Sequence, residues 1–270
     1  MTNPNWHQDT HLVHTGTVRS SNQETSEALY MTSGFIYDNA EQAAAAFRAE
    51  TDNFIYSRYG NPTVLMLETR LAQLEGAQVC RATSSGMAAV FCALACQLEQ
   101  GDRVVASHAL FGACYAILSK ILPKWGVDVV FVDGRDLNQW QDALKVPTKI
   151  VFLESPSNPL LHLVDLKGVS ELAKQAGAKV IVDNVFATPL YQKPLELGAD
   201  IVTYSATKHI DGQGRLLGGA VLGDEDFMNN IFLPFYRQTG PSISAFNAWI
   251  MLKSLETLSL RVDRQTANAT

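Results

Sequence analysis

The sequence contains 270 residues, of which 47% are hydrophobic and 18% are charged, and its formal net charge is −6. This length suffices for one large domain with a substantial buried core and small appendages. The acidic balance, without any run of lysines and arginines, argues mildly against a nucleic-acid partner. No stretch approaches the ~18 consecutive apolar residues of a membrane span, and residues 1–16 lack the apolar core of a secretory signal. We therefore expect a cytoplasmic protein with no nucleic-acid or membrane partner.

The cysteines are four in number, Cys80, Cys92, Cys96 and Cys114. Three lie in alanine- and leucine-rich surroundings, and the set shows neither CxxC spacing nor a matching histidine pair. This usage is typical of buried free thiols in a reducing compartment. It favours neither a disulfide framework nor a metal site, and we expect no bound metal.

The expected elements change character near residue 60. Residues 1–60 are irregular apart from an alanine-rich helix near 40–49, which is typical of an extended N-terminal arm. A helix is then expected to begin at Pro62 and end at Gly76, and a nearly all-apolar helix begins near Ser85. Runs rich in valine and isoleucine follow at 103–107, 127–133, 149–155, 178–184, 199–205 and 218–223.

Helical segments at 112–124, 137–145 and 165–176 separate most of these runs, and an amphipathic helix begins near 242. Apolar strands that alternate with helices predict an α/β fold with a mostly parallel sheet covered on both faces. In such sheets ligands bind at the carboxyl ends of the strands.

Polar residues follow three of the expected strands. Asp183 ends the run "KVIVD", where a buried carboxylate needs a cationic or hydrogen-bonding partner. Asn158 lies in the Pro-rich turn "SPSNP", and Ser205, Thr207 and Lys208 follow "DIVTY". Each has a plain structural alternative: a helix-capping aspartate, a simple turn and a surface lysine.

The stretch "TSSGMAA" opens the apolar helix. Its first backbone N–H groups have no intrahelical partner, and Gly86 lets a ligand approach the backbone, so the segment is suited to an anion such as phosphate. A serine N-cap at Ser85 explains the same residues. An anion site, a lysine amine, a carboxylate and an amide at one sheet edge are together the set that pyridoxal 5′-phosphate (PLP) requires.

The segments "YSRYGNPT", "SSGMAA", "ESPSNP", "IVDNVFATP" and "SATKHIDGQGR" resemble, in that order, the Cys/Met-metabolism family of PLP-dependent enzymes. The resemblance covers essentially the whole chain. It implies the aspartate-aminotransferase-like fold (fold type I) with a seven-stranded type of sheet. Residues 1–60 would form the N-terminal arm and 61–250 the PLP-binding large domain. Residues 251–270 would begin the helix that connects to a C-terminal small domain, which this sequence lacks.

The resemblance also implies roles for single residues. Lys208 matches the Schiff-base lysine that shuttles protons, Asp183 the partner of the pyridine nitrogen, and Asn158 the partner of the ring oxygen. Phe111 matches the residue that stacks on the ring. The phosphate cup matches Ser85, Gly86, Met87, Ser205 and Thr207. Tyr56 and Arg58 match residues that reach the phosphate of a neighbouring subunit, with Tyr56 also catalytic, which implies an active site shared within a dimer. From the resemblance we expect a homotetramer built as a dimer of dimers, but the sequence does not distinguish it from a dimer.

Phe111 distinguishes branches of the family. Lyases and synthases commonly carry tyrosine at this position, and a lyase that uses the phenol as a general acid would be impaired without it. "SATKHIDGQGR" is similar to the branch that converts O-succinylhomoserine and sulfide to homocysteine and succinate in methionine biosynthesis. We therefore expect an O-succinylhomoserine sulfhydrylase.

Other functions remain open from the sequence. They are a cystathionine gamma-synthase, a methionine or cystathionine gamma-lyase, an acetylhomoserine sulfhydrylase, and a truncated PLP-binding relative without turnover. The family's arginine for the substrate carboxylate lies in the C-terminal domain, and Arg261 and Arg264 are not proposed as substitutes. A nicotinamide-dependent dehydrogenase is not indicated, because the turn before the first buried helix is not the glycine-rich turn that such enzymes require.

Overall fold

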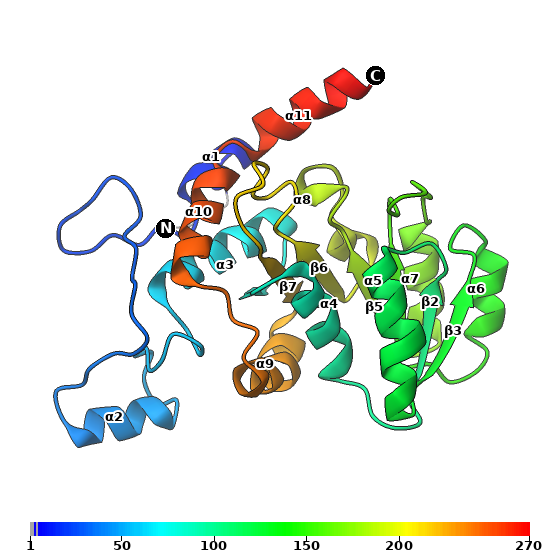
Figure 1. Ribbon diagram of the computed structural model, residues 1–270, viewed down its shortest axis with the longest axis horizontal. Coiled ribbons are helices and arrows are strands. Elements are labelled where there is room, and N and C mark those ends of the chain that lie inside the picture. The colour runs from blue at the N-terminus through cyan, green and yellow to red at the C-terminus, as the bar shows by residue number, and fades with distance from the viewer. Residues whose placement is uncertain (1–2, 4) are drawn as a thin grey trace.

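A central sheet organises the computed structural model, which describes residues 3 and 5–270 (Figure 1). Its seven strands have the order β1-β7-β6-β5-β4-β2-β3. They are β1 (Val79–Thr83), β2 (Arg103–Ser107), β3 (Asp128–Val132), β4 (Ile150–Glu154), β5 (Lys179–Asp183), β6 (Ile201–Ser205) and β7 (Gly219–Gly223). The pairs among β2 to β6 are parallel, whereas β7 is antiparallel to both β1 and β6. The predicted mostly parallel α/β sheet is thereby confirmed.

Helices occupy most of the connections. The α-helices are α1 (Gln8–His14), α2 (Ala40–Phe47), α3 (Pro62–Glu75), α4 (Gly86–Ala95), α5 (Gly112–Ala116), α6 (Leu137–Ala143), α7 (Leu166–Gln175), α8 (Thr188–Tyr191), α9 (Leu233–Thr239), α10 (Ala245–Leu255) and α11 (Leu258–Ala269). Two π-helical segments, Ile117–Ile121 and Phe227–Phe232, and two 3₁₀ segments, Leu122–Trp125 and Pro194–Leu197, complete the set. Among the described residues, no helix is both long and apolar enough to cross a membrane.

Three layers result, because successive side chains of a strand point to opposite faces of the sheet. Ile181 and Phe152 face a core formed with α4, α5 and α9. Val180 and Val151 face the opposite side, towards α6 and α7. Next to that second layer, α3 and α10 cover the same side of the sheet at β6 and β7. The sheet is therefore buried on both faces, and its polar ligand-binding groups can emerge only at the strand ends.

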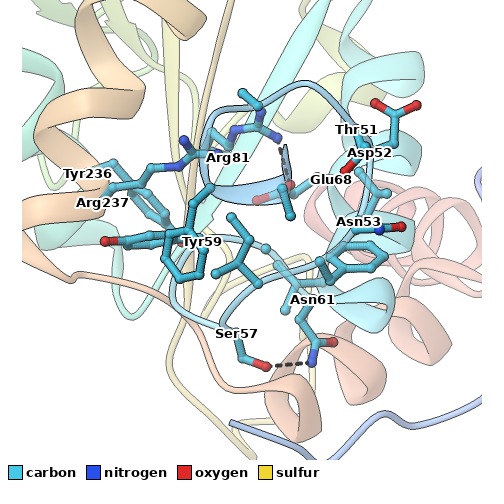
Figure 2. A pocket seen from close by; sticks show the side chains of 18 of the residues that line it. Thr51, Asp52, Asn53, Ser57, Tyr59, Asn61, Glu68, Arg81, Tyr236 and Arg237 are labelled. Carbon is cyan, nitrogen blue, oxygen red and sulfur yellow. Dashed lines mark hydrogen bonds and ion pairs between the residues drawn. The ribbon is translucent and has the colours of Figure 1, made fainter. Parts of the chain in front are cut away.

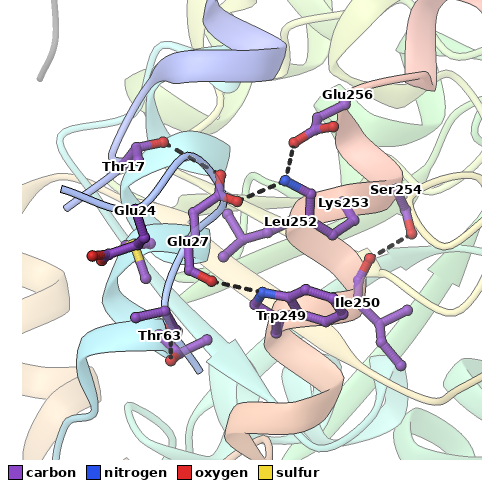
Figure 3. A network of polar contacts seen from close by, with 12 residues as sticks. Thr17, Glu24, Glu27, Thr63, Trp249, Ile250, Leu252, Lys253, Ser254 and Glu256 are labelled. Carbon is purple, nitrogen blue, oxygen red and sulfur yellow. Dashed lines mark hydrogen bonds and ion pairs between the residues drawn. The ribbon is translucent and has the colours of Figure 1, made fainter. Parts of the chain in front are cut away.

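The buried Glu27 is one of the residues that hold the N-terminal segment, the expected arm, against α3 and α10. Its Oε1 lies 2.8 Å from Arg70 Nη2 of α3, and its Oε2 lies 2.7 Å from Lys253 Nζ of α10. The indole of Trp249 donates a hydrogen bond to the Glu27 carbonyl at 2.9 Å (Figure 3). These contacts of Glu27 with Arg70, Lys253 and Trp249 are called the clasp below. Beyond the clasp the chain continues to α2, which lies away from the sheet in Figure 1.

The structure differs locally from several of the expected elements. The sequence pattern does not predict β1, whose residues "VCRAT" include the polar Arg81 and Thr83 at the edge of the sheet. It does not predict α1 either. The helix expected over 112–124 is continuous, but it passes from α-helical to π-helical and 3₁₀ geometry. The helix expected from 242 is divided into α10 and α11.

The cysteines are free in the structure. Cys80, Cys92 and Cys114 are buried, and Cys96 is half-buried. Burial raises the pKa of the Cys92 thiol to about 11 and that of Cys96 to about 12. These thiols are therefore held protonated at neutral pH, as expected for packing rather than reactive cysteines.

Candidate functional site

Strand register brings the polar residues of β4, β5 and β6 to one edge of the sheet. Glu154 is paired with Asp183 across β4 and β5, and Asp183 is paired with Thr203 across β5 and β6. Ser205 ends β6 opposite Gly219, which opens β7. Because these strand ends lie side by side, side chains separated by some fifty residues in sequence meet here.

A cavity of about 590 Å³ lies at this edge. Nine of the eleven predicted site residues line it, namely Ser85, Gly86, Met87, Phe111, Asn158, Asp183, Ser205, Thr207 and Lys208. The remaining lining residues are Val90, Glu154, Val185, Phe186, His209 and Leu217. The cavity thus combines apolar walls with a few convergent polar groups, which is typical of small-molecule sites.

The first turn of α4 forms one end of the cavity. Ser85 is the N-cap, and its hydroxyl accepts a hydrogen bond from Ala88 N at 3.1 Å. A Cβ placed on Gly86 would lie 2.4 Å from Ser205 Cβ, so only glycine allows the helix to approach β6 so closely. The unpaired N–H groups of α4 and the Ser205 side chain therefore share one small space, which is suited to an anion.

Lys208 and Thr207 follow directly after β6. The Lys208 side chain is exposed and belongs to the lining of the cavity. The Thr207 hydroxyl is engaged with the backbone of Gly218, donating to its carbonyl at 3.2 Å and accepting from its N–H at 3.1 Å. This pair of contacts ties the lysine-bearing turn to the strand that follows it.

Asp183 lies 7% exposed at the end of β5. Its Oδ1 accepts from Val185 N at 3.2 Å, and its Oδ2 lies 3.9 Å from Cys114 Sγ. Burial raises the pKa of Asp183 to about 6, although the hydrogen bonds from Val185 and Cys114 act in the opposite direction. A cationic ligand group beside this carboxylate would offset its desolvation.

Glu154 is a lining residue that the sequence reasoning missed. It is 3% exposed, its Oε2 accepts from Phe111 N at 2.6 Å, and its Oε1 accepts from Asn158 N at 3.1 Å. Burial, and then the neighbouring Asp183, raise the pKa of Glu154 to about 7. The available signal was an acidic residue at the end of an apolar strand, the same signal that indicated Asp183.

Phe111 and Asn158 stand on two different loops around this glutamate. Phe111 precedes α5, is 41% exposed and belongs to the lining of the cavity. Asn158 is half-buried and lies in the loop after β4, between the cis peptide bonds Ser155–Pro156 and Asn158–Pro159. Both positions allow contact with a planar ligand.

Of the residues that the structure describes, neither Tyr56 nor Arg58 lines this cavity. Arg58 lies over the rings of Tyr56 and Tyr59, and it donates a hydrogen bond to the Arg237 carbonyl in α9. The arm here covers a second cavity, of about 310 Å³, where Tyr59, Arg81 and Arg237 meet (Figure 2). The role of Tyr56 and Arg58 at the phosphate of a neighbouring subunit stays a prediction.

Comparisons with known proteins identify the family to which the chain is similar. Residues 9–270 match the family described as "Cys/Met metabolism PLP-dependent enzyme". The chain is 56% identical over 257 residues to an O-succinylhomoserine sulfhydrylase of Mycobacterium tuberculosis, covering 95% of this chain and 63% of that protein. It is 39% identical over 260 residues to an L-methionine gamma-lyase of Treponema denticola, covering 95% of this chain and 65% of that protein.

A solved structure extends the likeness to three dimensions. The crystal structure of a putative O-acetylhomoserine (thiol)-lyase from Campylobacter jejuni, which holds a pyridoxyl-lysine monophosphate group, superposes with a TM-score of 0.92. The two share 30% identity, and the match covers 98% of this chain and 74% of that one. The chain spans about two-thirds of the length of the curated relatives cited above. It belongs to the Cys/Met metabolism family of PLP-dependent enzymes.

Proposed function

We propose that the chain is the large-domain part of an O-succinylhomoserine sulfhydrylase, which converts O-succinylhomoserine and sulfide to homocysteine and succinate. In this replacement the Cγ–O bond to succinate breaks and a Cγ–S bond forms. The observation that carries the proposal is 56% identity to a relative of that name, together with phenylalanine at position 111. The coarser function, PLP-dependent chemistry of the Cys/Met family, follows from membership of the family.

The cavity residues fit PLP. The close approach of Gly86 to Ser205 leaves an anion site at the α4 N-terminus, where Ser85, Met87 and Thr207 would complete the phosphate cup. The buried carboxylate of Asp183 would hold a proton on the pyridine nitrogen, and the Asn158 amide would contact the ring oxygen. When bound, PLP supplies an electron sink for charge that develops at the substrate's α carbon.

The protein's own groups then move protons and position the substrate. Lys208 would bind the cofactor's aldehyde carbon and carry protons between the α and β carbons of the substrate, since its amine stands at the rim of the cavity. Phe111 would stack on the ring without offering a phenolic proton. Succinate departs as a stabilised carboxylate and needs little protonation, so the absence of the phenol costs this reaction less than it costs a gamma-lyase.

Assembly completes the proposal. Residues 1–60 would act as the arm, 61–250 as the PLP-binding domain, and 251–270 as the start of the connecting helix. Tyr56, as phosphate ligand and catalytic group, and Arg58, as phosphate ligand, would act on the neighbouring subunit of a homotetramer. Neither residue lines the cavity of its own chain, which supports this reading.

A methionine gamma-lyase is the second candidate, because the Treponema denticola relative carries that name at 39% identity. Phe111 disfavours it. The two reactions separate by product: homocysteine from O-succinylhomoserine and sulfide, against methanethiol from methionine. Because the chain spans 63% of the sulfhydrylase relative's length, cofactor binding and turnover have to be measured separately.

The first test is fixation of the cofactor by borohydride. The purified chain is mixed with PLP, its visible absorption is recorded, and the complex is reduced and digested for mass spectrometry. We expect a visible band and a pyridoxyl group on Lys208, both lost in Lys208→Ala. A label spread over surface lysines, or no band in the parent, would overturn the assignment of Lys208. Sulfide-dependent release of homocysteine then tests the reaction.

A further inference from the structure

Glu154 joins two loops that carry ligand-facing residues of the proposed site. One oxygen of its carboxyl group accepts the N–H of Phe111, which precedes α5, and the other accepts the N–H of Asn158, in the loop after β4. The distances are 2.6 Å and 3.1 Å. Phe111 and Glu154 are separated by 43 positions in the chain, so no local turn explains this contact.

The carboxyl group suits this task better than other side chains. Two acceptor oxygens are needed because the two donors come from different loops, and an amide would offer one acceptor only. Hydrogen bonds from N–H groups to a carboxylate are about twice as strong as those between neutral groups.

Burying the carboxyl group of Glu154 beside Asp183 costs folding free energy, so its presence calls for a compensating role in the site. The side chain is 3% exposed, and it faces Asp183 in register on the neighbouring strand, so two buried carboxyl groups lie together. Like charges at short range destabilise each other in a medium of low polarity. An apolar residue at the end of β4 would avoid that cost, and Glu154 has no part in the chemistry assigned to Lys208 and Asp183.

We infer that Glu154 is a positioning residue, which fixes the backbone of Phe111 and of Asn158 so that the phenyl ring and the amide meet PLP from two sides. The inference rests on the proposed function. Small displacements of a stacking ring or of an orienting amide cost affinity and rate, because a bound ligand retains full contact only within a narrow range of geometry.

The experiment compares Glu154→Gln and Glu154→Ala with the parent and with Glu68→Gln. Glu68 is a matched control: it is also a buried glutamate that accepts a backbone N–H, that of Ala82 at 2.8 Å, but it lies at the other cavity. The measured quantities are the dissociation constant of PLP, the visible circular dichroism of the bound cofactor and the thermal midpoint.

At pH 8.5, where a carboxyl group with a pKa of about 7 is ionised, we expect Glu154→Gln to weaken PLP binding about tenfold, the equivalent of one lost charge-assisted hydrogen bond, and Glu154→Ala to weaken it further. The visible circular dichroism should decrease with it, because that signal reports how the ring is held. Glu68→Gln should keep both properties, whatever happens to its thermal midpoint. Unchanged affinity and dichroism in Glu154→Gln, or equal losses in Glu68→Gln, would overturn the inference.

A second measurement needs neither variant nor cofactor. Amide hydrogen exchange of the parent should be at least tenfold slower at Phe111 than at the neighbouring Gly112, since the Phe111 N–H is held by a buried carboxyl group. Equal rates at the two amides would contradict the contact even if the Glu154 variants fail to fold. A parent that forms no visible band with PLP, yet protects Phe111, would contradict the proposed function and leave the anchoring role of Glu154 intact.

Discussion

The ionised carboxylate of Asp183 destabilises the folded chain because it is buried, and a cation bound beside it would offset that cost. Burial raises its pKa to about 6, above the roughly 3.9 of an unfolded aspartate. The unfolded chain therefore releases this proton at lower pH than the folded chain does. Between about pH 4 and pH 6, rising pH favours unfolding, and the cost persists at higher pH. A protonated pyridine nitrogen beside the carboxylate would remove it.

Asp183→Asn should therefore raise the stability of the cofactor-free chain and at the same time weaken its binding of PLP. Measured by urea denaturation without PLP, the variant should be more stable than the parent at pH 8, and the difference should shrink towards pH 4. Its affinity for PLP should fall at least tenfold, because the charge partner is lost. Asp142→Asn, in an exposed ion pair with Lys145, is the control and should match the parent. Parallel pH profiles for Asp183→Asn and the parent would contradict the charge argument.

Gly86 gives a steric test of the anion site. Its absent Cβ would meet Ser205 Cβ at 2.4 Å and Ser205 Oγ at 2.7 Å, so Gly86→Ala must push α4 away from β6. We expect a loss of about 1–3 kcal/mol in the free energy of unfolding, together with weaker binding of PLP and of inorganic phosphate. Gly34→Ala is the control, since its nearest atom would be Ile55 O at 3.8 Å. Phosphate affinity equal to the parent's in Gly86→Ala would remove the anion site from this position.

At the scale of elements, the sequence predicted the parallel strands because each contains a run of apolar residues rich in valine and isoleucine, such as "VIV" within "KVIVD". It did not predict β1, because this strand at the edge of the sheet has the charged Arg81 in the middle of its five residues, where Arg81 pairs with Glu68. Asp183 and Lys208 were predicted as site residues because charges at the ends of buried strands, combined with the anion site and the amide at the same sheet edge, fit the set that PLP requires, and because the family resemblance implies the same residues. Glu154 carries the same signal, but its importance depends on Phe111, which only the folded sheet brings near it.

The clasp around Glu27 predicts a pH dependence of the free energy of unfolding that is opposite in sign to that of Asp183. Burial alone would raise the pKa of Glu27, but the hydrogen bonds from Lys253 and Arg70 outweigh it and lower the pKa to about 2. The clasp therefore stabilises the fold above the unfolded pKa of about 4.3, and this contribution is lost as pH falls towards 2.

Glu27→Gln should lower the free energy of unfolding at pH 7 by on the order of 3 kcal/mol, because it leaves Arg70 buried beside a neutral partner. The difference from the parent should decrease between pH 4.5 and pH 2 in urea denaturation. Glu50→Gln is the matched control, since the Arg48–Glu50 pair is more than half exposed, and it should not change stability measurably. A constant difference for Glu27→Gln across that pH range would show that the charge of Glu27 is not what fastens the arm.

At the scale of the whole molecule, the question is whether residues of the N-terminal arm contribute to the PLP site of their own chain or to that of a second copy. It exposes large apolar side chains, among them Ile36, which is fully exposed, Phe47 and Met31. Tyr56 and Arg58 lie outside the cavity that holds the other predicted residues. An arm with this composition is suited to packing on a second copy, where Arg58 could reach that copy's phosphate cup, and the site would then be complete only in an oligomer.

Mixing two inactive chains tests this arrangement. Lys208→Ala chains lack the amine, and Arg58→Ala chains should bind PLP too weakly to be labelled at low cofactor concentration. If Arg58 acts on the partner, half of the randomly mixed dimers are hybrids, and each hybrid has one site with both native residues and one with neither. Borohydride fixation should then label about one quarter of the sites, on the Arg58→Ala chain alone. If Arg58 acts within its own chain, no site in the mixture combines both native residues, and the label stays at the background of the separate chains. Sedimentation of the same mixture reports whether the chains have associated, so that a missing label with intact dimers points to Arg58 acting in its own chain.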